Sequence, residues 1–309
     1  MRTVFMGTPD FADASLKALL GSRHEVCAVF TRADTPKNRG MKMTMPPVKI
    51  TALAEDIPVY QPSTLRSQEV YDILASIQPD IIIVAAYGMF LPKSILELPR
   101  YGCINVHASL LPKYRGASPI NAAIIEGESQ TGVTIMKMAK GIDTGDMLIS
   151  RAVDILPDDS YASLHDKLAP VGGQLLLEAL DLIESGNAIY TPQDDSLSTY
   201  AHIIKTEDAR ISFEWDAAAC ACHIRGYDPA PGAFAFLGGE RIKLFSAVKG
   251  DAAVSRGPGE IIGCDKKGLA VQAKDGVVLI REVQLNGKKR MPAADCFRGR
   301  PQLLEERFD

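Results

Sequence analysis

The sequence lacks the long apolar runs typical of a membrane protein. Its longest apolar segment, residues 81–86, has the length of one strand, whereas a membrane-spanning helix needs about 20 apolar residues. The first residues lead directly into an apolar strand-like run at residues 3–6, without a basic segment that precedes a signal stretch. We therefore expect a soluble, cytoplasmic protein.

Cysteine is also scarce. Six cysteines occur in 309 residues and none form a Cys-x-x-Cys pair, so neither a disulfide framework nor a zinc ribbon is predicted. Cys220, Cys222 and His223 are close in sequence, but on a helix they point in different directions, and no second ligand pair follows. We expect buried thiols beside a surface histidine here, and no metal.

Positive charge is not in excess. With 34 basic and 38 acidic residues the net charge is −4, which gives no global attraction to nucleic acid. Two local features differ from this average. Residues 32–49 carry five basic groups against one acidic group, and residues 206–309 carry 16 basic and 15 acidic groups where residues 1–205 carry 18 and 23. The segment 32–49 is therefore either an ordinary solvated loop or a local nucleic-acid contact.

Strand-like and helix-like segments alternate from the start of the chain to about residue 190, which predicts an α/β domain with a mainly parallel, doubly wound sheet. Residues 81–86 are so apolar that we expect a strand covered on both faces. The expected strands are residues 3–6, 26–30, 81–86, 102–107, 132–138 and 147–153, and the expected helices are residues 11–20, 48–55, 66–77 and 160–183. Between residues 31 and 47 we expect a long loop, a length typical of functional or disordered segments.

The remainder of the chain has a different pattern. Residues 191–200 carry Pro, Asp and Ser with little apolar content, so we expect a linker at residues 191–205 between domains at 1–190 and 206–309. After it, a helix at 215–225 and short strands at 233–248, 259–262, 269–273 and 277–283 suit a small β-barrel.

The candidate chemistry lies in one strand and one loop. Asn105 and His107 are two residues apart on a strand and project side by side, and Asp143 follows on a loop that contains two glycines. A lone histidine on a strand is more often structural, but an amide donor, an imidazole and a carboxylate together suit acyl transfer without a covalent nucleophile. Cys103 and Ser109 have no activating signature, so we interpret them as strand and turn residues.

The turn after the first strand, Gly7-Thr8-Pro9-Asp10, matches neither a dinucleotide-binding fingerprint nor a Walker A loop, so nucleotide binding is disfavoured. Several segments, however, closely resemble the methionyl-tRNA formyltransferases, a branch of the enzymes that use 10-formyltetrahydrofolate, and the resemblance spans the chain. These segments are Phe5-Met6-Gly7-Thr8-Pro9-Asp10-Phe11-Ala12, Ala86-Tyr87-Gly88, Asn105-Val106-His107-Ala108-Ser109-Leu110-Leu111-Pro112, Tyr114-Arg115-Gly116-Ala117-Ser118-Pro119-Ile120 and residues 132–136 with Asp143-Thr144-Gly145-Asp146.

The resemblance implies a Rossmann-like formyltransferase domain that holds the folate and amine site, followed by a small OB-like β-barrel that helps to hold tRNA. The implied catalytic residues are Asn105, His107 and Asp143, and the implied folate-binding residues are Ser109, Leu110, Leu111, Pro112, Tyr87, Gly88 and Phe90. The residues expected to bind tRNA are Lys37, Arg39, Lys42, Lys205, Lys288, Lys289 and Arg290, the last three because they form a compact basic cluster. Met41, Met43 and Met45 make the loop less basic than in some relatives.

The implied reaction is transfer of the formyl group of 10-formyltetrahydrofolate to the free α-amine of initiator methionyl-tRNA, by a monomer that needs no metal. The nearest alternative is a folate-dependent formyltransferase for an amino sugar or another small amine, which the basic loop disfavours. A glycinamide ribonucleotide formyltransferase would resemble only the first domain. A tRNA-binding protein with an inactive enzyme fold would lack part of the catalytic trio, which is intact here.

Overall fold

A computed structural model gives the fold and describes residues 1–37, 42–251 and 256–309, without the side chains of Lys37 and Lys42. The chain forms two compact units, each built from several segments. The first unit comprises Met1–Gly116, Gly132–Val153 and His165–Tyr200, and the second comprises Ala117–Thr131, Asp154–Leu164 and Ala201–Asp309.

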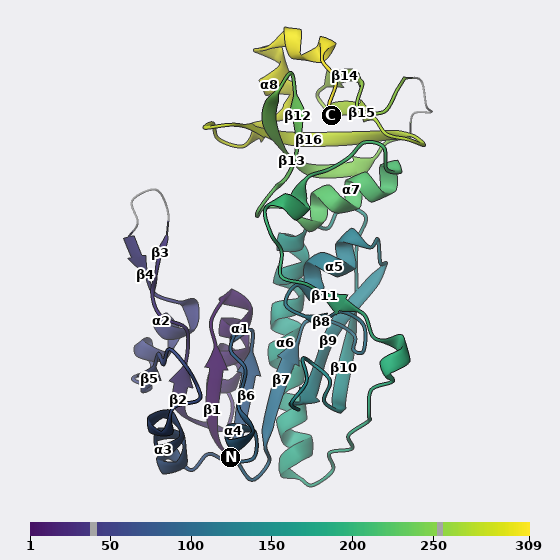
Figure 1. The fold of residues 1–309 in the computed structure, drawn as a ribbon. Helices are drawn as coiled ribbons and strands as arrows, with labels where there is room; N and C mark the ends of the chain where they lie inside the picture. The colour runs from purple at the N-terminus through teal and green to yellow at the C-terminus, as the bar shows by residue number, and fades with distance from the viewer. Residues whose placement is uncertain (38–41, 252–255) are drawn as a thin grey trace. The chain divides into compact units, whose positions relative to one another are not determined.

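A seven-stranded sheet forms the centre of the first unit (Figure 1). Its strand order is β10 (Met147–Asp154), β9 (Gln130–Lys137), β7 (Cys103–His107), β6 (Ile81–Ala85), β1 (Arg2–Gly7), β2 (Glu25–Phe30) and β5 (Val59–Tyr60). β1 pairs in parallel with β2 and β6, and β6 pairs in parallel with β7. β9 lies antiparallel to β7. The predicted mainly parallel sheet is therefore confirmed.

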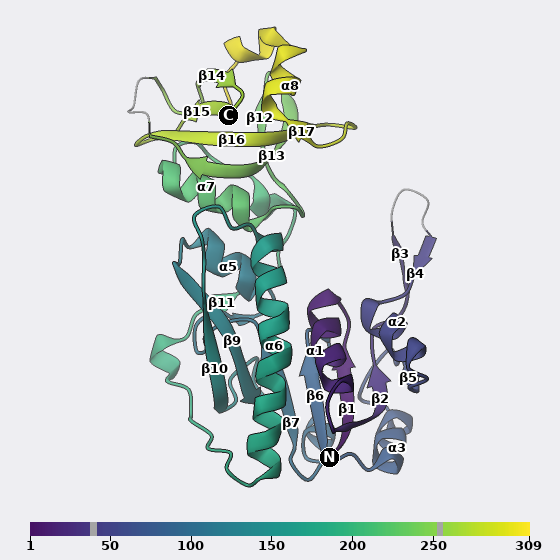
Figure 2. The ribbon, with the colours of Figure 1, turned by 180° about the vertical axis from the view of Figure 1, so that it is seen from behind.

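Helices cover both faces of this sheet, as its apolar strands require. α1 (Asp10–Leu20) and α6 (Tyr161–Glu184) lie together on one face, which is turned to the viewer in Figure 2. They approach so closely that a Cβ at Gly173 would lie 2.8 Å from the Cβ of Ala18. The opposite face packs against α3 (Gln68–Ile77) and α4 (Lys93–Leu96).

Several short elements differ from the sequence-based expectation, and two of them bear on the site and on the division into units. The flanks of the expected long loop pair as an antiparallel hairpin, β3 (Thr35–Lys37) with β4 (Lys42–Thr44), ahead of α2 (Pro47–Ala54). A short helix, α5 (Pro119–Ile125), was not expected, although Pro at its first position is a common helix-start signal.

The second unit contains a second sheet, with strand order β12 (Ala233–Leu237), β13 (Glu240–Lys249), β16 (Val277–Leu285), β15 (Gly268–Gln272) and β14 (Ile261–Asp265). β17 (Met291–Pro292) pairs with β16, while α7 (Ala217–Gly226) and α8 (Ala293–Arg298) complete the unit. Within the described residues, the C-terminal segment lies between the two edge strands of this sheet. It forms one isolated bridge with β12, Leu237 to Phe308, and one with the residue that precedes β14, Glu260 to Arg307. A closed OB-like barrel therefore stays a prediction.

The division into units differs from the expected boundaries, because α5 groups with the second unit. Its Asn121 amide donates a 2.7 Å hydrogen bond to the carbonyl of Gly226 at the end of α7. A Cβ at Gly226 would lie 2.4 Å from the side chain of Ile125, so the two helices are in close contact. The expected linker also divides, because residues up to Tyr200 group with the first unit.

Shorter elements complete the chain: β8 (Arg115–Gly116), β11 (Tyr200–Ala201) and the 3-10 helices η1 (Asp195–Leu197), η2 (Glu207–Ala209) and η3 (Pro301–Glu305). None of the helices in the described residues combines the length and apolar character needed to cross a membrane.

The expectation of a surface histidine at position 223 was wrong. His223 is buried, with its ring packed edge-on against those of Trp215 and Tyr227. Burial lowers the pKa of His223 to about 4. Cys220 is buried beside it and Cys222 is half-buried, both as free thiols.

Candidate active site

The end of β7 carries two of the three candidate catalytic side chains. In the pleated strand Cys103, Asn105 and His107 share one face, and Asn105 is half-buried while His107 is buried. Cys103 lies deeper, and burial raises the pKa of its thiol to about 12. Because only the thiolate is a good nucleophile, this environment does not favour Cys103 as a nucleophile.

The third side chain, Asp143, is carried by the loop between β9 and β10. Asp143 adopts a left-handed backbone conformation with φ of 51°, which is unfavourable for a non-glycine residue. Gly145 allows the loop to lie against the end of β9, because a Cβ there would be 1.7 Å from the carbonyl oxygen of Lys137. The loop therefore turns sharply and directs the carboxylate toward β7.

Two donors fix the carboxylate of Asp143. The backbone N–H of Gly116 donates to Oδ2 at 2.8 Å, and the side-chain amide of Asn105 donates to Oδ1 at 3.3 Å. The bond from Gly116 is the shorter of the two, while the long bond from Asn105 leaves its amide available to a second acceptor.

The imidazole of His107 is oriented from its other side. Nε2 lies 2.9 Å from the carbonyl oxygen of Tyr114, and because a carbonyl only accepts, Nε2 carries a hydrogen. Nδ1 then faces Asp143, 3.6 Å from Oδ2. The structure thus brings Asn105, His107 and Asp143 together, with Nδ1 as the ring atom that faces the carboxylate.

The residues expected to bind folate follow β6 and β7 at the carboxyl edge of the sheet, where ligands bind in folds of this type. Ser109 donates its hydroxyl hydrogen to the carbonyl of Lys113 at 2.6 Å, so it serves the turn. Leu111 is buried, whereas Leu110 and Pro112 are half-buried.

Tyr87, Gly88 and Phe90 follow β6. The hydroxyl of Tyr87 is buried with no partner among the described residues, and burial raises the pKa of Tyr87 to about 12. Gly88 has φ of 75°, and Phe90 is 68% exposed. An exposed aromatic ring and a partnerless hydroxyl suit a ligand that stacks and accepts a hydrogen bond.

The residues expected to bind tRNA occupy several places. Lys37 and Lys42 begin and end the β3–β4 connection, and Arg39 lies outside the described residues. Lys205 is exposed, as are Lys288 and Lys289 on the turn between β16 and β17.

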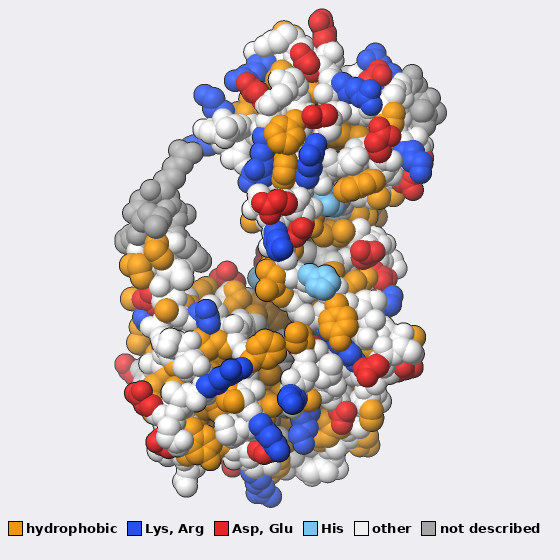
Figure 3. Space-filling view, viewed as in Figure 1, with side chains coloured by type: hydrophobic (Ala, Val, Ile, Leu, Met, Phe, Trp, Pro, Cys, Tyr) orange, Lys and Arg blue, Asp and Glu red, His pale blue; other side chains and the backbone are white. Residues whose placement is uncertain are grey.

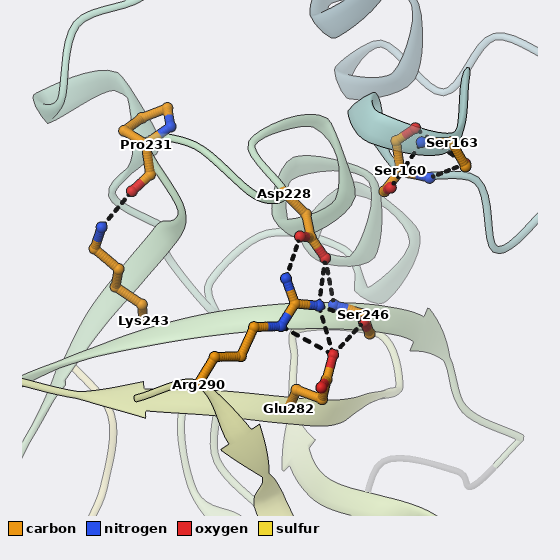
Figure 4. Close-up of polar contacts among 8 residues, drawn as sticks. All are labelled: Ser160, Ser163, Asp228, Pro231, Lys243, Ser246, Glu282 and Arg290. Atoms are coloured by element: carbon orange, nitrogen blue, oxygen red, sulfur yellow. Dashed lines mark hydrogen bonds and ion pairs between the residues drawn. The ribbon is translucent and has the colours of Figure 1, made fainter. Parts of the chain in front are cut away.

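Arg290 differs from its lysine neighbours, because its half-buried guanidinium is bound by partners within the unit (Figure 4). It donates to both carboxylate oxygens of Asp228, at 2.6 and 3.1 Å, and to Glu282 and Ser246. It also lies 4.2 Å above the ring of Phe245. These internal partners give Arg290 a structural role.

Sequence reasoning missed two pairs of an arginine with an aromatic ring on β12 of the second unit, one of which is formed by the buried Phe234. Arg241 lies 3.6 Å over the ring of Phe234, and Arg210 lies 5.5 Å from the ring centre of Phe236. In Figure 3, blue side chains flank orange aromatic surface over β12 and β13. Alternation of Phe with Ala along β12 is the signal that could have shown them.

Among the described residues, one cluster has a spacing that could hold a metal ion, formed by His24, Asp181 and Glu184. Its carboxylates already pair with Arg23, and Glu184 also pairs with the N-terminal ammonium. It shares no residue with the candidate catalytic trio.

The fold brings an amide, an imidazole and a carboxylate together at the carboxyl edge of its sheet, an arrangement that suits group transfer. Comparison with known proteins makes the class specific. Residues 1–180 match the model of the formyl transferase family, and residues 203–301 match that of the formyl transferase C-terminal domain. The chain belongs to the formyl transferase family.

Among curated relatives, the methionyl-tRNA formyltransferase of Geobacter sulfurreducens is 45% identical over 97% of this chain and 94% of its own length. That of Moorella thermoacetica is 45% identical over 99% and 98%. The sugar 3N-formyl transferase WlaRD has a TM-score of 0.68 at 17% identity over 94% of this chain and 99% of its own. HypX from Aquifex aeolicus, in complex with tetrahydrofolic acid, has a TM-score of 0.63 at 19% identity over 96% of this chain and 47% of its own.

Proposed function

We propose that this protein transfers the formyl group of 10-formyltetrahydrofolate to the free α-amine of methionyl-tRNA and so provides N-formylmethionyl-tRNA for translation initiation. The observation that carries this proposal is the identity of about 45% to methionyl-tRNA formyltransferases over 97% of the chain, across both matched domains. The Asn105, His107 and Asp143 arrangement supports it independently, because it suits acyl transfer.

The reaction is balanced without a further reactant. The neutral amine nitrogen of methionine attacks the formyl carbon, and the carbonyl electrons move to oxygen to form a tetrahedral intermediate. The amine nitrogen then loses a proton, N10 of the folate gains one, and the bond between N10 and the formyl carbon breaks. The oxyanion re-forms the carbonyl as this bond breaks, and the products are N-formylmethionyl-tRNA and tetrahydrofolate.

The three side chains take separate parts in this reaction. Asn105 donates its amide hydrogen to the oxyanion, and protonated His107 stabilises the same charge. Asp143 holds the imidazole in its charged form and assists removal of the proton from the amine. Its position supports this part, since Oδ2 lies 3.6 Å from Nδ1 of His107.

We place the folate donor along the carboxyl edge of the sheet. The turn from Ser109 to Pro112 and the segment with Tyr87, Gly88 and Phe90 lie at the ends of neighbouring strands. The exposed ring of Phe90 and the partnerless hydroxyl of Tyr87 support a flat, polar ligand there. The proposed reaction uses no metal.

We place tRNA on basic groups in both units. In the first unit these are Lys37, Arg39 and Lys42. In the second they are Lys205, Lys288, Lys289 and Arg290, extended by the exposed Arg210 beside the half-buried ring of Phe236. Phosphate contacts hold a nucleic acid in register, and cations stacked on rings suit its bases and ribose. We expect a cytoplasmic monomer.

Product analysis with a radiolabelled formyl donor tests the function. We expect label in methionine esterified to tRNA, and none in free methionine or amino-sugar nucleotides. A sugar-amine formyltransferase, to which the fold is also similar, would give the opposite distribution. The His107→Ala variant serves as the control for label that does not depend on the site.

A further inference from the structure

The segment expected to be a linker reaches the catalytic loop. The side-chain amide of Gln193 donates to two carbonyl oxygens of this loop, that of Asp143 at 2.8 Å and that of Gly145 at 2.7 Å. Both amide hydrogens of Gln193 are therefore used on the turn that carries the catalytic carboxylate.

The oxygen of the same amide is also bound by a protein partner. Oε1 of Gln193 accepts from Nε of Arg115 at 2.9 Å, and Arg115 also donates to Asp195 at 2.7 Å. The side chain of Arg115 is only 2% exposed. Because the guanidinium only donates and the loop carbonyls only accept, the amide of Gln193 fits in one orientation.

A second residue of the segment supports the imidazole. The hydroxyl oxygen of Thr199 accepts from the backbone N–H of Tyr114 at 2.8 Å, and its carbonyl accepts from the N–H of Arg115 at 2.9 Å. Tyr114 is the residue whose carbonyl receives the Nε2 hydrogen of His107. The segment from Gln193 to Thr199 thus binds the backbone of the Asp143 loop and the backbone at Tyr114, which contacts His107.

The backbone at these points needs external support. Asp143 and Tyr114 both adopt left-handed conformations, with φ of 51° and 60°, which are unfavourable for non-glycine residues. Such conformations persist when surrounding contacts determine them. Gln193 and Thr199 make contacts of this kind, each to the strained residue itself.

We propose that Gln193 is a positioning residue that sets the geometry of the Asp143 loop, and that Thr199 does the same for His107 through Tyr114. The proposal rests on the proposed catalytic roles of Asp143 and His107. It assigns a part in formyl transfer to a segment that composition alone marks as a linker.

The variant Gln193→Glu separates positioning from simple structural support. Glutamate has the same size and keeps, with added charge, the acceptor for Arg115. It replaces the two donor hydrogens by an oxygen that faces the carbonyls of Asp143 and Gly145. The contact to Arg115 is kept while the loop is repelled. Leu197→Ala, at a side chain 62% exposed in the same segment, is the matched control.

The experiment measures kcat, both KM values, the pH profile of kcat and the melting temperature of the full chain. For Gln193→Glu we expect kcat to fall by about ten- to a hundredfold, the scale of catalytic-group misplacement, with both KM values changed less than about threefold. The pH profile of kcat should shift, because the carboxylate moves relative to His107. Leu197→Ala should match the wild type.

The second variant, Thr199→Val, keeps size and removes the acceptor for Tyr114, so kcat should fall and its pH profile shift, while Thr199→Ser should restore both. Wild-type kcat and pH profile in both Gln193→Glu and Thr199→Val would overturn the proposal. A kcat loss explained entirely by a lower fraction of folded protein would also overturn it. If the wild type fails to formylate methionyl-tRNA, the proposed function is wrong instead.

Discussion

The Nδ1 atom of His107 faces the carboxylate of Asp143 across 3.6 Å, a separation longer than a hydrogen bond. The two groups are aligned without being joined, because each is held by backbone partners of its own. Catalytic hydrogen bonds often close only when substrate binds, so this geometry suits a carboxylate that orients the imidazole and can still reach a proton of the substrate.

Removal of either group should therefore stop the chemistry and leave the fold intact. We expect His107→Ala and Asp143→Asn each to lower kcat by at least about a hundredfold, the usual contribution of an acid–base group. Single-turnover formylation and circular dichroism provide the measurement. Cys103→Ala should retain activity, since its buried thiol is not a nucleophile, and near-normal rates in the first two variants would remove the trio.

The basic segment at residues 32–49 should contribute to the binding of tRNA and not to the binding of the folate donor. Neutralising Arg39 and Lys42 together should raise the KM for methionyl-tRNA and flatten its dependence on salt, because fewer counterions are released on binding. The KM for the folate donor should stay constant. Lys17→Gln with Lys93→Gln, at lysines 64% and 83% exposed, is a charge-matched control. A lost donor affinity with an unchanged salt slope would assign the hairpin to the folate site.

Neighbours in the basic cluster should behave differently. Lys288→Gln with Lys289→Gln should weaken tRNA binding without a change in stability, because both side chains are exposed. Arg290→Ala should lower the free energy of unfolding by about 2 kcal/mol, less than for a fully buried pair, since it leaves Asp228 unpaired. Denaturant titration and filter binding measure the two effects, and stability of Arg290→Ala equal to wild type would contradict the structural role.

The buried His223 predicts a loss of stability in acid. Its pKa is about 4 in the folded chain, against an ordinary value of 6.5. Between these values the unfolded chain binds more protons, so the free energy of unfolding should fall as the pH drops from 6.5 to about 4, by roughly 3 kcal/mol in total. It should be insensitive to this group above pH 6.5.

The variant His223→Gln should flatten this dependence. His202→Gln, at an exposed histidine of the same unit, should not. Urea titrations at several pH values provide the measurement, and equal slopes in all three proteins would exclude His223 as the source.

The sequence predicts what depends on local pattern. The alternation in residues 103–107 places Asn105 and His107 on one face, and the apolar run at 81–85 becomes a buried central strand. Contacts between residues far apart in the sequence could not be predicted in this way. Nothing near Gln193 indicates that its amide meets Asp143, because that contact joins residues 50 apart and depends on the backbone turn at each.

The burial of His223 and the ion pair of Arg290 were missed for the same reason. His223 was expected at the surface because a polar residue on a short helix is usually exposed, but Trp215 and Tyr227 cover it. Arg290 was grouped with Lys288 and Lys289 by charge, although Asp228, 62 residues earlier in the chain, pairs with it. Composition reports the charge of a segment and not the partner that neutralises it.

The passage of the chain back and forth between the units restricts recombination within the family. A cut after residue 205 would keep α5 but remove α7 and the carbonyl of Gly226 that receives the Asn121 amide. A viable exchange of the second unit between two formyltransferases has to transplant Ala117–Thr131, Asp154–Leu164 and Ala201–Asp309 together. A crossover at a single junction instead places α5 of one parent against α7 of the other, so the hybrid should be less stable than its parents wherever the side chains of this contact differ.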